Sequence, residues 1–171
     1  MGKVNKAKAM LSLALIRELR NRVTYYRSMI DRNIARYREF VEKVRHIAPE
    51  KAKAAEHEIK NLEYLKLAID RIELLLEAVL TRLETMIVAE DILGAATLMK
   101  NLVRELKKSP IYALPFAATI VDRVDTITSE IISGTKLSGL DRKFVDFKTK
   151  EAIKIIEEAR KIAMERSTSY R

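Results

Sequence analysis

The chain contains no cysteine, no tryptophan and no glutamine, and only 4 glycines and 3 prolines among its 171 residues. The lack of cysteine excludes disulfides, thiol catalysis and zinc sites built on cysteine. A protein of many strands needs glycine and proline at its turns, so an all-β or doubly wound fold is close to excluded. Aromatic residues make up only 6% of the chain, which leaves few side chains to stack on nucleotide bases.

Long apolar runs are also missing. The most apolar early stretch, residues 9–16, follows three lysines as the core of a signal peptide would, but charged residues come directly after it instead of a cleavage site. It is far shorter than the roughly 18 apolar residues of a membrane-spanning helix. We therefore expect this stretch to begin an amphipathic helix in a cytoplasmic protein.

What the sequence has is helical periodicity. Hydrophobic residues make up 48% and charged residues 33%, and the apolar positions recur in steps of three and four. This pattern predicts helices over about residues 4–48, 50–88, 92–108, 110–133 and 142–166. Tyr26 and Tyr37 fall at apolar positions of the first helix. Pro115 lies inside the first turns of the fourth helix and is expected to shift its start or to kink it.

The predicted fold is all-α. The first two helices are long and joined by a short turn near Pro49, so they should form a long antiparallel hairpin. Two or three shorter C-terminal helices are expected to pack on it. We predict a helical core over residues 1–134 and a linker with a C-terminal helix over residues 135–171.

The chain has one weak point within its longest helical stretch. Glu90 and Asp91 are followed by Gly94, and glycine costs about 1 kcal/mol relative to alanine in a helix interior. The apolar pattern continues beyond it. The third helix therefore either continues the second helix or bends away from it, which makes Glu90, Asp91 and Gly94 a candidate hinge.

The net charge of +9 is concentrated at the start of the chain, since the first 48 residues hold 12 basic and 4 acidic residues. Arg20, Arg27, Arg38 and Arg45 are spaced by 7, 11 and 7 residues, so they form a row beside the apolar positions. Such a row is either a solvated helix face or a contact for a polyanion, a membrane or a nucleic acid.

Lysines that precede an apolar cluster favour the membrane, because interfacial helices anchor in this way. The cluster is Met10, Leu11, Leu13 and Leu15. The residues predicted to bind a membrane are Lys3, Lys6, Lys8, Arg17, Arg20, Arg27, Arg38 and Arg45.

No motif for catalysis is present. His46 and His57 belong to no Glu-x-x-His pair and lack a partner histidine at metal-ligand spacing. The glycines form no phosphate-binding loop, and there is no Gly-x-Ser-x-Gly nucleophile turn. We expect no enzyme activity, no catalytic residue, no cofactor and no metal.

The order of these parts resembles the ESCRT-III core, and most of all the archaeal CdvB-type cell-division proteins. The resemblance covers roughly residues 15–135. It rests on residues 82–106 and on a basic first helix that pairs with an acidic second one, which is the longer of the two if it runs unbroken from Glu50 to Ser109. Within residues 82–106, Arg82-Leu83-Glu84-Thr85 precedes Glu90-Asp91-Ile92-Leu93-Gly94, and then Leu98-Met99-Lys100 and Leu102-Val103-Arg104-Glu105-Leu106 follow.

This resemblance implies a non-enzymatic, membrane-remodelling polymer subunit. It would be peripheral on the inner face of the cell membrane and would form filaments with itself and with paralogous subunits on this anionic surface, in cell division or membrane scission. The stretch from Glu90 to Gly94 would be the hinge between closed and open states, and the last helix would have the position of an autoinhibitory helix. The family also implies a AAA ATPase partner with a microtubule-interacting-and-transport domain, but neither the proline-rich nor the helical recruitment motif is present.

Two other hypotheses about function remain open. A basic helical bundle could bind nucleic acid, in which case DNA binding would depend steeply on salt and vesicles would stay bare. A passive coiled-coil scaffold would instead form a small oligomer of fixed size at every concentration. Nucleic acid is the less favoured partner, because no turn and recognition helix is evident.

Overall fold

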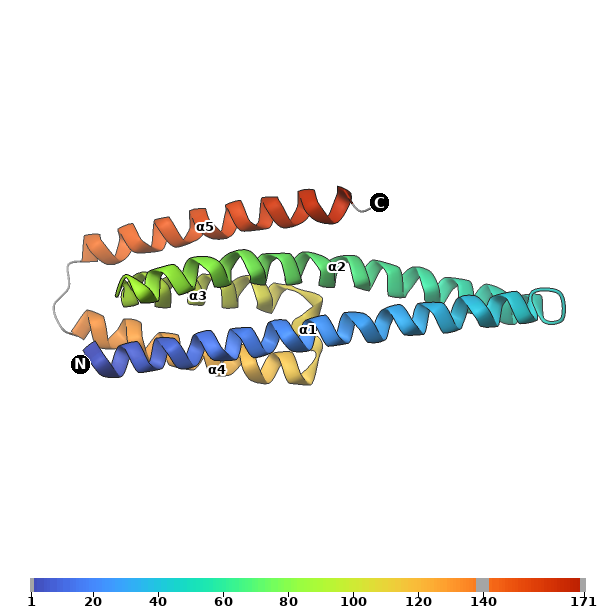
Figure 1. The fold of residues 1–171 in the computed structure, drawn as a ribbon, viewed down its shortest axis with the longest axis horizontal. Coiled ribbons are helices and arrows are strands. Elements are labelled where there is room, and N and C mark those ends of the chain that lie inside the picture. The colour runs from blue at the N-terminus through green and yellow to red at the C-terminus, as the bar shows by residue number, and fades with distance from the viewer. Residues whose placement is uncertain (1, 138–141, 170–171) are drawn as a thin grey trace.

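The computed structural model describes residues 2–137 and 142–169, and every regular element within them is helical. The order is α1 (Gly2–Val44), α2 (Pro49–Val88), α3 (Ile92–Lys108), a 3-10 turn (Pro110–Ala113), α4 (Pro115–Leu137) and α5 (Arg142–Ser169). α1 and α2 form a long antiparallel hairpin, and α3, α4 and α5 pack against it (Figure 1). The predicted all-α hairpin fold is thus confirmed.

The hairpin turn forms where the apolar pattern is interrupted. α1 ends at Val44, and the amides of Ile47 and Ala48 both donate to the carbonyl of Val44. Pro49 then opens α2, a position where proline's fixed φ suits the helix and its missing N–H is not needed. The first helix is therefore four residues shorter at its end than the sequence pattern indicates.

The fourth predicted helix is divided at its start. Ser109 is extended, Pro110–Ala113 form a single 3-10 turn, and α4 begins only at Pro115. A proline disfavours helical geometry in the residue before it, and Leu114 is indeed extended with φ −84° and ψ 127°. At its other end α4 runs past Gly134 to Leu137. The rest of the expected linker, residues 138–141, lies outside the described residues.

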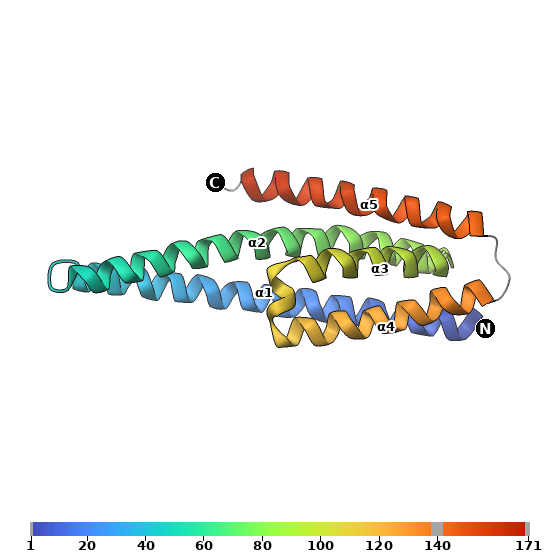
Figure 2. The same ribbon diagram turned by 180° about the vertical axis from the view of Figure 1, so that it is seen from behind.

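The helices form a bundle at one end of the hairpin and leave the other end uncovered. α4 lies along the first half of α1, while α3 and α5 lie along the second half of α2 (Figures 1 and 2). The end of α5 reaches Arg71, whose Nε donates to Ser167 at 3.3 Å. Beyond this point the hairpin continues as two helices alone, which we call the arm (residues 30–66).

α3 is the centre of the core. Leu98, Met99 and Leu102 have no exposed surface, and Leu106 is only 2% exposed. They belong to one apolar cluster that draws side chains from all five helices. The tip of the arm has its own small cluster, with Val41 packed on Ala52 and Ala55. Since this cluster consists of only a few small side chains, hydrophobic burial stabilises the arm less than the bundle.

Asp125 joins α4 to α3 and gives the bundle a testable dependence on pH. Its carboxylate accepts a hydrogen bond from Lys107 at 2.8 Å, and Lys100 lies 3.6 Å away. The hydrogen bond from Lys107 is the main cause that lowers the pKa of Asp125 below its ordinary value of 3.8. A carboxyl whose pKa is lower in the folded state contributes stability above its unfolded pKa and loses it as the pH falls.

We expect Asp125→Asn to lower the free energy of unfolding by about 1 kcal/mol at pH 7. The difference from the wild type should shrink as the pH falls below about 4 and then through the lowered pKa of Asp125 in the folded protein, because the protonated carboxyl is neutral, as the asparagine amide is. Urea unfolding at pH 7 and at pH 3 measures both values. An equal difference at the two pH values would show that the ionised form of Asp125 is not what stabilises the bundle.

Candidate functional site

The predicted hinge forms a sharp turn that reverses the chain between α2 and α3. Glu90 has a φ of 61°, which makes it the only non-glycine residue with positive φ among those described. The amide of Glu90 donates to the carbonyl of Ile87, and the amide of Asp91 donates to the carbonyl of Met86. These two bonds form a Schellman motif, which usually has glycine where this chain has Glu90. The reversal therefore carries backbone strain.

Asp91 connects this turn to two helices. Its Oδ1 accepts the amide of Gly94 at 3.0 Å and caps the N-terminus of α3. Its Oδ2 forms an ion pair at 2.9 Å with Lys148 of α5, whose side chain is only 16% exposed. A Cβ at position 94 would lie 2.3 Å from Oδ2 of Asp91. Glycine is thus needed here for the close approach of the capping carboxylate, and not for an unusual φ.

Glu90→Gly should stabilise the turn by about 1 kcal/mol, because glycine adopts a positive φ without steric cost. The substitution also removes an exposed ion pair of 3.3 Å with Lys6. Glu90→Ala is the matched control, since it loses the same ion pair but keeps a Cβ in the strained conformation. Thermal unfolding should place the glycine variant above the wild type and the alanine variant at or below it. Equal melting temperatures of the two variants would mean that the turn stores no strain.

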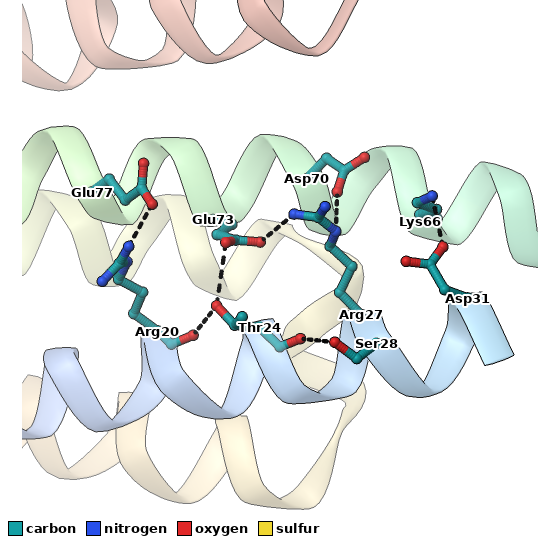
Figure 3. Close-up of polar contacts among 9 residues, drawn as sticks. All are labelled: Arg20, Thr24, Arg27, Ser28, Asp31, Lys66, Asp70, Glu73 and Glu77. Atoms are coloured by element: carbon teal, nitrogen blue, oxygen red, sulfur yellow. Dashed lines mark hydrogen bonds and ion pairs between the residues drawn. The ribbon is translucent and has the colours of Figure 1, made fainter. Parts of the chain in front are cut away.

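The predicted arginine row faces α2. Arg17 contacts Glu84 at 2.7 Å, Arg38 contacts Glu63 at 2.6 Å, and Arg45 contacts Glu56 at 3.6 Å. Figure 3 shows the central part of this series, in which Arg20 contacts Glu77 at 2.5 Å and Arg27 contacts both Glu73 and Asp70. We call this series, with the pair Asp31 and Lys66, the ion-pair ladder. Its arginines are thus occupied by carboxylates of the same chain.

Arg27 contacts two carboxylates of α2, those of Asp70 and Glu73. Burial favours its neutral form, but the hydrogen bond to Glu73 and the charges of Asp70 and Glu73 outweigh this effect and raise its pKa. Burial raises the pKa of Asp70 above its ordinary value, although Arg27 and Lys66 act against the shift. Glu73 is therefore the partner that holds Arg27 most firmly, and the hydroxyl of Thr24 donates to the same carboxylate at 3.2 Å (Figure 3).

The lysines at the start of α1 differ in their surroundings. Lys6 pairs with Glu90, and Lys8 pairs with Glu130 of α4 at 3.2 Å. Lys3 is exposed beside Val4, which is itself 58% exposed. In the apolar cluster that follows, Leu13 and Leu15 are buried, whereas Met10 and Leu11 are exposed. The apolar cluster is therefore divided between the core and the surface. Membrane binding by the eight basic residues that the sequence indicates, Lys3 to Arg45, stays a prediction.

A second basic face lies on the opposite side of α1 from the ladder. We call it the outer stripe, defined by Tyr25, Met29, Arg32, Arg36 and Phe40. These residues follow one another in steps of four, three, four and four, so they lie in one line along the helix. The three apolar side chains are 63%, 41% and 42% exposed, in chain order. Sequence reasoning missed this stripe.

The two arginines of the outer stripe differ from the other arginines of α1. Arg17, Arg20, Arg27 and Arg38 belong to the ladder, and Arg22 pairs with Glu18 one turn away. Within residues 2–137 and 142–169, Arg32 and Arg36 have no ion-pair or hydrogen-bond partner.

The periodicity places Tyr37 among the apolar positions of α1 that should be covered, but its side chain is 38% exposed. That prediction is wrong, because no third helix covers the arm.

No residue cluster suited to metal binding occurs in the described part of the chain. None of its helices is both long enough and apolar enough to cross a membrane. A scan against protein-family models finds no match, and searches of curated proteins and of solved structures find no similar protein.

Proposed function

We propose that the protein is a non-enzymatic polymer subunit of the ESCRT-III type that assembles on anionic membranes, in cell division or membrane scission. The observation that carries the proposal is the strained reversal at Glu90. The sequence resemblance implies a hinge at this position, and the packing of α3, α4 and α5 on the hairpin would then be the closed arrangement that such a hinge opens. A residue with φ of 61° has a helical alternative of lower local energy.

Opening at this turn would change which surfaces are available for assembly. α3 buries Leu98, Met99 and Leu102 against the hairpin. If α3 instead continued α2 as one helix, apolar faces of both would need new cover. Neighbouring copies of the chain or paralogous subunits are the partners that this mechanism supplies. Release of α5, which Lys148 holds at Asp91, would be part of the same step.

The test is electron microscopy combined with co-sedimentation, using the full chain with vesicles of phosphatidylcholine alone and vesicles that also contain phosphatidylserine. We expect protein to sediment with the anionic vesicles only, and filaments, rings or tubulated vesicles to appear there. Glu90→Gly should assemble about fivefold less readily than Glu90→Ala, because about 1 kcal/mol stabilises its closed state. Smooth vesicles with all protein in the supernatant at low salt would refute the proposal.

Nucleic-acid binding is the second candidate, and the unpaired Arg32 and Arg36 are the observation in its favour. It predicts that duplex DNA is retained in a gel-shift assay at low salt and released steeply as salt rises. A passive scaffold predicts one small mass at every concentration in light scattering. The proposed partner ATPase would be tested by adding it to preformed filaments, although the sequence offers no clear motif to recruit it.

A further inference from the structure

The ion-pair ladder leaves open which face of α1 contacts the proposed membrane. The guanidinium groups of the ladder point toward α2 and are already paired with carboxylates (Figure 3). A lipid phosphate would have to displace a pairing that also joins the two helices. The outer stripe lies on the far side of α1, where the arginines have no such partner.

We infer that the outer stripe is the lipid-binding face, with Arg32 and Arg36 at the phosphates of anionic lipids and Tyr25, Met29 and Phe40 in the headgroup layer. The inference rests on the proposed function and moves its lipid contact to the side of α1 opposite the predicted arginines. The stripe runs for about 22 Å along the helix. α4 covers α1 only as far as the contact of Phe116 with Tyr26, so most of the stripe lies on the arm.

The chemistry of the stripe matches that of a membrane surface. An unpaired guanidinium binds a phosphate through two parallel N–H donors. Tyrosine and phenylalanine beside basic residues are typical of helices that lie in the headgroup region. Phe40 and Met29 are large apolar side chains that are more than 40% exposed, and a lipid layer would remove this surface from water.

A second copy of the chain is a poorer match for the stripe, because the described residues offer no acidic face to receive it. The carboxylates without an ion pair are scattered and lie among lysines or arginines: Glu50 and Glu58 beside Lys51, Lys53 and Lys60, Asp122 beside Arg123, Asp146 beside Lys143, and Glu157 and Glu158 beside Lys154, Arg160 and Lys161. A nucleic acid would satisfy the arginines but would gain little from Met29. The lipid surface is the one occupant that uses all five side chains.

The arm supplies its own control face. On α2, Lys53, Lys60 and Tyr64 are exposed, while Ala52 and Ala55 are buried against Val41 of α1. The exposed residues therefore point away from α1, as the outer stripe points away from α2. A membrane that lies on the outer stripe cannot at the same time contact Tyr64.

Since the chain has no tryptophan, a single introduced indole reports on its own position. Tyr25→Trp and Phe40→Trp should shift their emission to shorter wavelength when vesicles with phosphatidylserine are added. Tyr64→Trp should not shift. A shift of Tyr64→Trp alone, or of all three variants equally, would overturn the inference, because the indole would then be buried on the wrong face or on no particular face.

The matched charge reversals complete the experiment. Arg32→Glu with Arg36→Glu should weaken binding to anionic vesicles at least about tenfold, and Lys53→Glu with Lys60→Glu, which changes the net charge equally, by less than about threefold. Circular dichroism of both variants checks that the helices persist. Equal losses in the two variants would overturn the outer stripe but leave the proposed function in place. Absence of binding by the wild type would overturn both, and binding to duplex DNA without vesicles would favour the rival function.

Discussion

A variant in which the arginines of the ion-pair ladder are reversed to glutamate is expected to lose about 3 kcal/mol of folding stability. The substitutions are Arg20→Glu, Arg27→Glu, Arg38→Glu and Arg45→Glu. Each one replaces an attraction across the hairpin with a repulsion of the same range. Individual pairs of this kind contribute little, because most of their side chains are between a third and two-thirds exposed. The tip of the arm should suffer most, since its apolar cluster is small.

Urea unfolding measures the loss, and hydrogen exchange locates it. We expect amides of the arm to exchange much faster in the reversed variant, while the amides of α3 remain protected. The control is the charge-swapped protein, which adds Glu77→Arg, Glu73→Arg, Glu63→Arg and Glu56→Arg and should recover most of the stability. If the swapped protein were no more stable than the reversed one, the ladder would not contribute to the hairpin.

This experiment also bears on lipid binding. The reversed variant should bind anionic vesicles poorly whichever face is used, because its fold is weakened and its net charge falls. The charge-swapped protein keeps the wild-type net charge and an intact outer stripe. Binding by the swapped protein would show that the arginines of the ladder are dispensable for lipid contact.

Ile156→Asp is expected to release α5 from the bundle. Ile156 is 3% exposed and belongs to the main apolar cluster. A carboxylate placed there is buried without a partner, which costs on the order of 3 to 5 kcal/mol. Polar contacts of α5, such as those that join Lys148 to Asp91, Arg160 to Glu105 and Ser167 to Arg71, each contribute too little to compensate.

Limited proteolysis is the direct measurement, since a released α5 should be cleaved much faster than the hairpin. Ile153→Asp is the matched control, because Ile153 lies on the same helix but is 42% exposed. Under the proposed function the Ile156→Asp variant should also assemble at lower concentration. Cleavage throughout α1 and α2 at the same rate would mean that α5 unfolds only together with the whole chain.

How far the sequence predicts this molecule can be followed at particular residues. α3 has the bounds that the apolar pattern predicts, residues 92–108, and Pro110 excludes a longer helix. That α3 is separate from α2 follows from the cap that Asp91 forms in the structure, whereas the sequence left a continuous helix open. Both ends of α3 are determined by residues next to them in the sequence, so a prediction of its bounds needs no knowledge of the other helices. The predicted start of α4, at residue 110, is too early. Either Pro110 or Pro115 could open the helix, and the sequence pattern does not say which; in the structure Pro115 opens it and Leu114 is extended.

The candidate site was harder to predict because it depends on two helices at once. Spacing alone places Arg20 and Arg27 near the apolar positions, but it does not say which flank of α1 they occupy. That is decided by the register of the hairpin, which brings Glu73 and Glu77 to them. A search of α2 for carboxylates at matching heptad spacing would have found the ladder, and by elimination Arg32 and Arg36.

The pair of Asp31 and Lys66 is the one rung of the ladder in which α1 supplies the acid and α2 supplies the base. In every rung the two residue numbers add up to between 97 and 101. Sliding one helix by a heptad would replace Lys66 opposite Asp31 with Ile59 in one direction and with Glu73 in the other. Most arginines would still meet a carboxylate, so only this inverted rung opposes the slip. The pair of Asp31 and Lys66 therefore fixes the register of α1 against α2 within one chain. It would fix the same register between two chains that had exchanged these helices in a domain swap.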